Sequence, residues 1–192
     1  MIDLEKRQIR QNILDIRDNM SVSEIDKLSE KIISTLVKLP VFKNSSNIML
    51  YLSFNNEVDS FRLIDYCKRY NKRVIVPFCI KNGTKIVPTE IKDVKKGLVR
   101  SSFGFMQPKR DMVKPVDIEN IDLIVVPGIS FDRRCYRIGY GAGYYDRFLG
   151  KLNFKIPTVG LAYDFQIISS APTEYHDIPL DYVVTEKRII IR

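Results

Sequence analysis

The sequence has little histidine and little cysteine, and both shortages limit the kinds of site that it can build. Of its 192 residues, one is histidine and three are cysteine. Cys67, Cys79 and Cys135 are widely spaced and form no CxxC pair, which argues against a structural zinc site and against a disulfide framework. An odd number of thiols suits a reducing compartment. We therefore expect a cytoplasmic protein without a structural zinc ion.

The sequence also lacks an apolar run of membrane-spanning length. Its longest runs, such as 48–52 and 121–126, have the length of a strand, whereas a membrane-spanning helix needs roughly 20 residues. The N-terminus, MIDLEKRQ, has no apolar core of a secretory signal. With 45% hydrophobic and 28% charged residues, the composition is that of a folded globular protein. We expect one domain over residues 1–192 and no contact with a membrane.

Acidic residues are fewer than basic ones. The chain holds 31 Lys and Arg against 23 Asp and Glu, a net charge of +8. This excess attracts anions, so nucleic acid, a nucleotide and a polyanionic small substrate all fit as partners. No RNP motif, zinc finger or basic tail appears, and Lys and Arg are spread along the whole chain. Nucleic acid therefore stays open with weak support.

Two helices are predicted before the first strand. Apolar residues at helical spacing predict a basic helix over 4–19. Ser21 and Glu24 form the S-x-x-E capping box of a second helix, which we expect to end near Lys38. This N-terminal helical segment, residues 1–40, is expected to pack on the rest of the domain.

Strand-like and helical stretches alternate through the rest of the chain. Strands are predicted at 47–54, 73–80, 85–91, 121–127, 157–163, 182–185 and 188–192, with a helix at 60–70. The Asn-Gly dipeptide at 82–83 favours a tight turn. Residues 93–114 have no clear period, and we expect an ordered loop region that forms a lid or a cleft wall. The pattern predicts an α/β fold, a three-layer sandwich on a largely parallel sheet, with the ligand site outside the strand carboxyl ends.

A glycine-rich segment, residues 131–146, carries the chemistry that the residues themselves suggest. It follows a buried strand and leads into a helix near Tyr144. Its glycines let the backbone approach a ligand and turn successive amides into one concavity, which is a geometry that holds phosphate. Arg133, Arg134 and Arg137 add positive charge, and Asp146 could hold a divalent cation. The segment fits a structural turn about as well, with Asp146 as a helix-terminus carboxylate.

Motifs along nearly the whole chain resemble those of one enzyme family. The strongest is RIGYGAGYYD at 137–146, of the form R-[LI]-G-x-G-x-G-[YF]-[YF]-D. The others are KRQIR at 6–10, YLSFNNE at 51–57, FGFMQP at 103–108, VPGISFD at 126–132, VGLAY at 159–163, Gln166, PTEYHD at 172–177 and LDY at 180–182. Together they resemble the 5-formyltetrahydrofolate cyclo-ligases, also called 5,10-methenyltetrahydrofolate synthetases.

The resemblance implies an enzyme that uses ATP and Mg²⁺ to convert 5-formyltetrahydrofolate into 5,10-methenyltetrahydrofolate, on a fold similar to ribose-phosphate isomerases and CoA transferases. In the family mechanism the formyl oxygen attacks the γ-phosphate of ATP, and N10 then attacks the resulting imidoyl phosphate. Such catalysis depends on positioning and charge stabilisation rather than on a side-chain nucleophile. The expected partners are ATP and a folate that can carry a polyglutamate tail, and the expected state is a monomer.

The resemblance also implies roles for individual residues. ATP would contact Lys6, Arg7, Arg10, Arg134, Arg137, Ile138, Gly139, Tyr140, Gly141, Ala142, Gly143, Tyr144 and Tyr145. The folate would contact Leu52, Glu57 and Tyr144. Asp146 and Asp181 would hold the magnesium ion, and Arg137 and Asp146 would serve catalysis.

Some of these positions have structural interpretations as well. Glu57 could cap the helix that follows it. Cys67 and Cys79 are expected in the core, and His176 in a structural role near the cleft. Cys135 stands where the family usually has glycine, which predicts a left-handed turn at some cost in strain.

Two rival functions remain open at this point. One is a paralogue of the same fold that binds folate or nucleotide without this turnover. The other is a non-catalytic basic module that binds RNA, for which tight and strongly salt-dependent binding would be expected.

Overall fold

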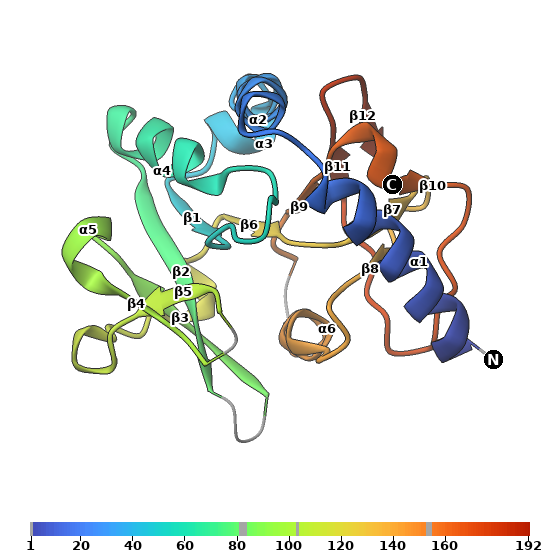
Figure 1. The fold of residues 1–192 in the computed structure, drawn as a ribbon. Helices are drawn as coiled ribbons and strands as arrows, with labels where there is room; N and C mark the ends of the chain where they lie inside the picture. Colours follow the sequence, from blue (N-terminus) through green and yellow to red (C-terminus); the bar gives the residue numbers. More distant parts are fainter. Residues whose placement is uncertain (1, 81–83, 103, 153–154) are drawn as a thin grey trace.

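A mostly parallel sheet forms the centre of the computed structural model, which describes residues 2–80, 84–102, 104–152 and 155–192 (Figure 1). The sheet has seven strands in the order β12-β11-β9-β6-β1-β2-β3. Its parallel strands are β1 (Asn47–Leu50), β2 (Arg73–Ile80), β6 (Leu123–Val126), β9 (Thr158–Leu161) and β11 (Tyr182–Val184). The edge strands β3 (Lys85–Glu90) and β12 (Ile189–Ile191) are antiparallel. The predicted largely parallel sheet is confirmed.

Three helices cover one face of the sheet, and they are α2 (Val22–Leu36), α3 (Pro40–Lys43) and α4 (Ser60–Arg69). The predicted capping box starts α2, because the Ser21 hydroxyl accepts from the Glu24 amide and the Glu24 carboxylate accepts from the Ser21 amide at 2.9 Å. Ile33 of α2 is fully buried, as is Ile48 of β1, in the cluster that forms this half of the core. The side chains pack there because successive strand residues point to opposite faces.

The other face of the sheet is covered by α6 (Tyr144–Leu149). Met49, which alternates with Ile48 along β1, is fully buried on this side. It belongs to a second core cluster with Phe148 and Leu149 of α6. Helices on both faces of the sheet give the three layers that the sequence predicts (Figure 1).

The first helix, α1 (Ile2–Asp18), lies beside the smaller sheet of β10 (Ile167–Ile168), β7 (Ser130–Asp132) and β8 (Arg137–Ile138) (Figure 1). Of its hydrophobic side chains, Ile13 is the buried one, whereas Lys6 and Arg17 are both buried. Basic side chains therefore anchor α1 more than an apolar stripe does.

Residues 93–114 were predicted to form a loop without regular structure, and this prediction is wrong. The segment contains α5 (Val94–Gly97), the antiparallel pair β4 (Leu98–Arg100) and β5 (Met106–Pro108), and a 3-10 turn at Arg110–Met112. Periodicity does not reveal strands of three residues, because so short a strand contains little alternation. Further 3-10 turns lie at Ile118–Asn120 and Asp164–Gln166.

One other sequence prediction differs from the structure in extent, and one is not tested. The strand predicted over 47–54 ends at Leu50, and residues 51–59 instead form a loop at the carboxyl end of β1. The Asn-Gly turn predicted at 82–83 lies outside the described residues. Among the residues that are described, no helix is both long and apolar enough to cross a membrane.

Candidate active site

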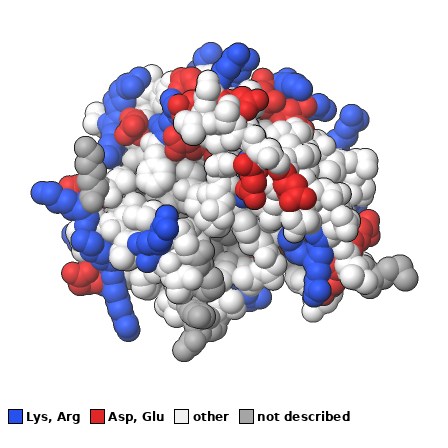
Figure 2. All heavy atoms as spheres, in the orientation of Figure 1, with Lys and Arg blue, Asp and Glu red and all other residues white. Residues whose placement is uncertain are grey.

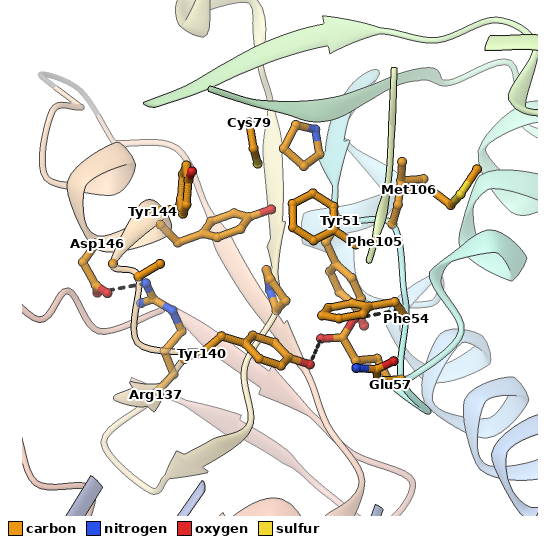
Figure 3. Close-up of a pocket in the computed structure, with 18 of the residues that line it drawn as sticks. Tyr51, Phe54, Glu57, Cys79, Phe105, Met106, Arg137, Tyr140, Tyr144 and Asp146 are labelled. Atoms are coloured by element: carbon orange, nitrogen blue, oxygen red, sulfur yellow. Dashed lines mark hydrogen bonds and ion pairs between the residues drawn. The ribbon is translucent and has the colours of Figure 1, made fainter. Parts of the chain in front are cut away.

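A cleft of about 530 Å³ opens at the carboxyl ends of the parallel strands. Leu52 follows β1 and Pro127 follows β6, whereas Cys79 lies near the end of β2. Phe105, just before β5, and Met106, the first residue of β5, form a wall of the cleft (Figure 3). The cleft therefore lies where the topology predicts it, and its volume is in the range of small-molecule sites.

One end of the cleft is aromatic and holds a single buried carboxylate, Glu57. Its side chain accepts hydrogen bonds from the Phe54 amide at 3.1 Å and from the Tyr140 hydroxyl at 2.7 Å (Figure 3). Glu57 does not cap α4, because Asp59 does so by accepting from the Phe61 amide at 3.0 Å. The capping interpretation of Glu57 is wrong, and this carboxylate is left facing the cleft.

Burial has a strong effect on Glu57. It raises the pKa of this carboxyl group to about 7, against the opposing effects of Arg17 and of the hydrogen bonds from Tyr140 and Phe54. Desolvation disfavours the charged form of a carboxyl group, and a nearby cation favours it. Glu57 is therefore a group whose charge changes near neutral pH.

The other end of the cleft is formed by the glycine loop, residues 139–143, and the start of α6. Gly141 and Gly143 have φ angles of +98° and +64°, which glycine adopts without a steric penalty. A Cβ atom added at Gly139 would meet nothing within 4 Å. The loop thus leaves its backbone open to a ligand on the side where Gly139 lies.

Arg137 and Asp146 form an ion pair at this end. Arg137 Nη2 donates to Asp146 Oδ1 at 2.8 Å, and Arg137 Nη1 donates to the Ile178 carbonyl at 2.9 Å (Figure 3). The Ile178 amide donates to the same Oδ1 atom at 3.4 Å. Burial lowers the pKa of Arg137, although Asp146 opposes this effect. These hydrogen bonds of Asp146 both use Oδ1, and the residue lines the cleft.

Helix α1 brings its basic residues to the glycine loop. Arg10 Nε donates to the Gly139 carbonyl at 2.7 Å. Lys6 Nζ donates to Asp177 at 2.7 Å and to Glu174 at 3.2 Å. Burial lowers the pKa of Lys6, but these acidic partners outweigh it and the net shift is upward. Of the predicted pair, Arg10 thus contacts the loop, whereas Lys6 pairs with acidic side chains of residues 174–177.

Comparison with known proteins identifies the family. A model of the 5-formyltetrahydrofolate cyclo-ligase family matches residues 3–186. This chain belongs to that cyclo-ligase family. A 5-formyltetrahydrofolate cyclo-ligase of Haemophilus influenzae is 30% identical over 179 residues, which cover 92% of this chain and 95% of the relative.

Solved structures agree with the cyclo-ligase assignment. The NMR structure of the 5,10-methenyltetrahydrofolate synthetase of Aquifex aeolicus has a TM-score of 0.82 and 38% identity, covering 97% of this chain and 92% of that one. A 5,10-methenyltetrahydrofolate synthetase from Mycoplasma pneumoniae has a TM-score of 0.76 and 27% identity, covering 94% and 98%. The fold and the family are therefore shared along the whole chain.

The structure brings most of the predicted cyclo-ligase site residues together. The predicted residues that line the cleft are Leu52, Glu57, Arg137, Gly139, Tyr140, Ala142, Gly143, Tyr144, Tyr145 and Asp146. Gly141 lies between them in the loop, with a Cβ position 3.7 Å from Arg10 Nη2. Ile138 is buried in β8, and its carbonyl accepts from the Ile129 amide at 2.8 Å. Arg7 is exposed on α1.

Asp181 and Arg134 lie outside the cleft, so the structure does not bring these two predicted residues together with the others. Asp181 precedes β11, so it lies at the amino ends of the parallel strands, opposite the edge that carries the cleft. Its Oδ2 atom accepts from the Thr158 amide and hydroxyl, both at 3.0 Å. Arg134 pairs with Asp132 at 2.9 Å and donates to the Ala171 carbonyl at 3.1 Å. Asp181 thus stabilises the ends of two strands, and Arg134 stabilises a turn. Neither residue lines the cleft.

Three structural predictions can be checked at the thiols and the histidine. Cys135 has a φ angle of +62°, so it adopts the left-handed turn predicted where the family has glycine. Cys67 is buried as expected, but Cys79 is half-buried and lines the cleft. Burial raises the pKa of Cys135 to about 11, which suits an inert thiol. His176 is half exposed in the 172–177 segment, 3.9 Å from Glu174.

Arg17 and the acidic partners of Lys6 are contacts of the site that the sequence did not predict. Arg17 is fully buried, and its Nη2 atom donates to the Tyr140 hydroxyl at 2.7 Å. A signal for Arg17 was present, because Lys6, Arg10 and Arg17 share one helix face at spacings of four and seven residues. No comparable signal links Lys6 to Asp177, since 171 residues separate them.

Proposed function

We propose that this chain catalyses the ATP-dependent cyclisation of 5-formyltetrahydrofolate to 5,10-methenyltetrahydrofolate. One observation carries the proposal: a single cleft has the buried carboxylate Glu57 at its aromatic end and the pair Arg137–Asp146 with an open glycine loop at its other end. A folate bound at the first end would present its formyl group to a nucleotide phosphate at the second end. Family membership supplies the reaction, and the cleft supplies an arrangement that fits it.

The proposed reaction has two steps. The formyl oxygen attacks the γ-phosphorus of ATP, the bond to ADP breaks, and an imidoyl phosphate forms at N5. N10 then attacks the formyl carbon, loses its proton, and phosphate leaves with the former formyl oxygen. No side-chain nucleophile is required, which fits a cleft whose cysteine, Cys79, has its pKa raised by burial to about 11. The protein would act by positioning and by stabilising phosphoryl charge.

The folate half of the cleft would use Leu52, Glu57 and Tyr144. A carboxylate oxygen has two lone pairs, so Glu57 can accept from pterin N–H groups while it keeps its bonds to Phe54 and Tyr140. Leu52 is buried and lines the cleft. Tyr144 lies across the cleft and could present its ring for stacking (Figure 3).

The nucleotide half would use the glycine loop and the basic face of α1. Loop amides would bind phosphate oxygens, and Arg10 would reach them from its present position at the Gly139 carbonyl. Arg137 would stabilise the transferring phosphoryl group once the nucleotide competes for its guanidinium. Lys6 lies farther along the same face and would contribute if its partners Asp177 and Glu174 rearranged.

This end of the cleft offers few protein ligands for a magnesium ion. Mg²⁺ is usually bound through one or two carboxylates together with substrate phosphates and waters. Asp146 offers a carboxylate beside the proposed phosphate site. A second carboxylate, that of Asp177, lies nearby, because the next residue, Ile178, donates its amide to Asp146. The described residues contain no cluster of three metal-binding side chains. Bound there, the ion would neutralise phosphate charge, with Asp146 as its main protein ligand.

The folate would also carry an anionic tail, and a basic segment lies near the cleft. Residues 92–114 hold seven Lys and Arg against two Asp, which gives +5 of the total net charge of +8. Basic side chains gather on the side of the molecule that carries α5, β4 and β5 (Figure 2). Arg100 pairs with Met106 across β4 and β5 and so shares its face, and Met106 lines the cleft. We propose that a polyglutamate tail runs along this segment.

Two simpler proposals complete the assignment. The enzyme would work as a monomer, because one chain supplies both ends of the cleft. It would work in the cytoplasm, where its three free thiols would stay reduced. Size-exclusion chromatography and fractionation would test these two statements.

The activity is tested by following the near-ultraviolet absorbance of the methenyl product. Purified protein with 5-formyltetrahydrofolate, ATP and Mg²⁺ should form product with one phosphate released per turnover, and chelation of the metal should stop the reaction. Absence of an ATP-dependent change would leave a binding paralogue as the better description. Tight RNA binding with a steep salt dependence, independent of Mg²⁺ and ATP, would favour the RNA module.

The polyglutamate proposal has its own test. Charge reversal by Arg100→Glu should reduce the preference for a triglutamate over a monoglutamate substrate several-fold, with little effect on the monoglutamate. Lys31→Glu on α2, an exposed residue of a helix that does not line the cleft, is the matched control. An unchanged preference in Arg100→Glu would place the tail elsewhere.

A further inference from the structure

Arg17 is a buried charge that the proposed chemistry does not use. It is 0% exposed, and its Nε and Nη1 atoms have no hydrogen-bond partner among the described residues. An arginine that is buried with unpaired donors costs stability, so its presence calls for a role other than stability. The third nitrogen of the guanidinium, Nη2, donates at 2.7 Å to the hydroxyl of Tyr140, a residue that lines the cleft.

Tyr140 links this arginine to Glu57. An arginine can only donate, so the Tyr140 oxygen accepts from Arg17 and must direct its own proton elsewhere. It donates that proton to Glu57 Oε1 at 2.7 Å (Figure 3). The ring of Tyr140 is held by Phe54, at 5.2 Å between ring centroids, and by the Arg17 guanidinium, at 5.8 Å from its centroid.

The chain of hydrogen bonds has one direction from end to end, and this direction suits one form of Glu57. Oε1 accepts from Tyr140, and Oε2 accepts from the Phe54 amide at 3.1 Å. Both donors bind the charged carboxylate more strongly than a neutral carboxyl group. The geometry therefore favours the carboxylate form and fixes its orientation.

The loop that carries Glu57 is attached to the same helix. Asn56 Nδ2 donates to the Arg17 carbonyl at 3.0 Å. Asn55 and Asn56 both have positive φ angles, of +47° and +58°, which are uncommon for residues other than glycine. Both the side chain and the carbonyl of Arg17 thus contribute to the placement of Glu57.

From these contacts we infer that Arg17 is a positioning residue for the folate site, which acts through the Tyr140 hydroxyl to hold Glu57 as an oriented carboxylate. The inference rests on the proposed role of Glu57 as the group that binds the pterin. It assigns to the C-terminal turn of α1 a function in folate binding, separate from the proposed function of its N-terminal turns in nucleotide binding.

The inference predicts a particular pH dependence. Five titratable or charged groups act on Glu57. They are Arg17 of α1, Tyr51 after β1, Tyr140 of the glycine loop, Tyr145 of α6 and Tyr163 after β9. Arg17 is the cation of this set, so it is the group that favours the carboxylate by its charge. Without it, folate binding should require a higher pH.

The test uses binding of 5-formyltetrahydrofolate by calorimetry, without ATP, from pH 6 to pH 9. In the unmodified protein, affinity should rise with pH through about 7, where Glu57 ionises. Arg17→Met should move this midpoint upward by roughly one to two pH units, so that affinity lost at neutral pH returns at high pH. Arg17→Lys, which keeps the charge, should restore most of the original midpoint.

Tyr140→Phe keeps the inference testable if the Arg17 variants fail to fold. Tyr140 is 42% exposed, so its replacement should be tolerated. Loss of the hydroxyl should raise the midpoint by a smaller amount, and Arg17→Met in the Tyr140→Phe background should add less than it does alone. Arg69→Met, at an exposed arginine of α4, is the control and should change nothing.

The outcomes separate the two levels of the proposal. If the unmodified protein neither binds 5-formyltetrahydrofolate nor converts it, the proposed function fails. If it does both, but Arg17→Met weakens binding equally at every pH, or Tyr140→Phe leaves the midpoint unchanged, then the positioning role is wrong and Arg17 is only structural.

Discussion

The two ends of the cleft each hold a carboxylate, but they stabilise it differently. Glu57 lies among aromatic rings, is 7% exposed, and meets its cation only through a tyrosine hydroxyl. Asp146 is half-buried and pairs directly with Arg137 at 2.8 Å. Asp146 thus has a direct cationic partner. Glu57 has none in direct contact among its described hydrogen bonds, and burial raises its pKa to about 7. The first arrangement suits recognition of an uncharged N–H edge, and the second suits exchange of partners with a phosphate and a cation.

The largest effect is expected at the charged end. Asp146→Asn keeps the size of the side chain but removes the anion that would hold the cation, so kcat should fall by about 100-fold or more. A Mg²⁺ titration of the steady-state rate should also shift to higher concentrations. Thermal denaturation measures whether the fold survives, and it should show a small change. Normal turnover by Asp146→Asn would remove the metal assignment.

The aromatic end should respond in KM rather than in kcat. Glu57→Gln loses a charged acceptor for the pterin, and a hydrogen bond to a charged group contributes about 1.5–3 kcal/mol. The KM for 5-formyltetrahydrofolate should therefore rise about 10-fold or more, while the KM for ATP changes little. Glu119→Gln, at an exposed glutamate outside the cleft, is the control. Equal rises in both KM values would contradict the division of the cleft into two halves.

The comparison also predicts a pH dependence in the unmodified enzyme. The pKa of Glu57 is raised above its ordinary value, so the carboxylate form is present above about pH 7 and is lost as the pH falls through that value. The KM for folate should rise by several-fold between pH 8 and pH 6, and the KM for ATP should not follow it. Initial-rate measurements across this range check the prediction, and parallel profiles for the two substrates would argue against it.

The smallest effect on activity is expected at Asp181. This residue lies at the amino ends of the strands, where it accepts from Thr158 and from Arg192 at 3.2 Å. Asp181→Asn should leave kcat within about twofold, while loss of charged hydrogen bonds lowers the free energy of unfolding by about 1 kcal/mol. Chemical denaturation and the standard assay measure the two quantities. A loss of activity as large as that of Asp146→Asn would restore Asp181 as a metal ligand.

The sequence predicted those features that depend on neighbouring residues. The Ser21–Glu24 capping box and the full extent of β2 (Arg73–Ile80) rest on contacts within a few residues or on a strong apolar pattern. The left-handed turn at Cys135 was predicted on another ground, the glycine that the family usually has at this position. The position of the cleft followed from strand order, since parallel strands place their carboxyl ends together.

The sequence does not reveal placements and contacts that distant segments decide. Asp181 and Asp146 both appear as isolated acidic residues in the sequence, and the register of β11 with β9 is what puts Asp181 at the far edge. The burial of Lys6 depends on acidic partners near the other end of the chain. Helix propensity makes α1 a helix but does not say which of its basic residues is buried, so Arg17 was missed.

The docking of α1 has a consequence for biosynthesis. This helix is synthesised before its anchors Tyr140, Gly139, Glu174 and Asp177, which lie 123 to 171 residues later in the chain. The nascent chain must therefore hold a finished, basic helix without its partners until most of the protein has been synthesised. Neither ligand should be able to bind a nascent chain that ends before these anchors, so an added folate or nucleotide should protect from degradation only chains that contain them.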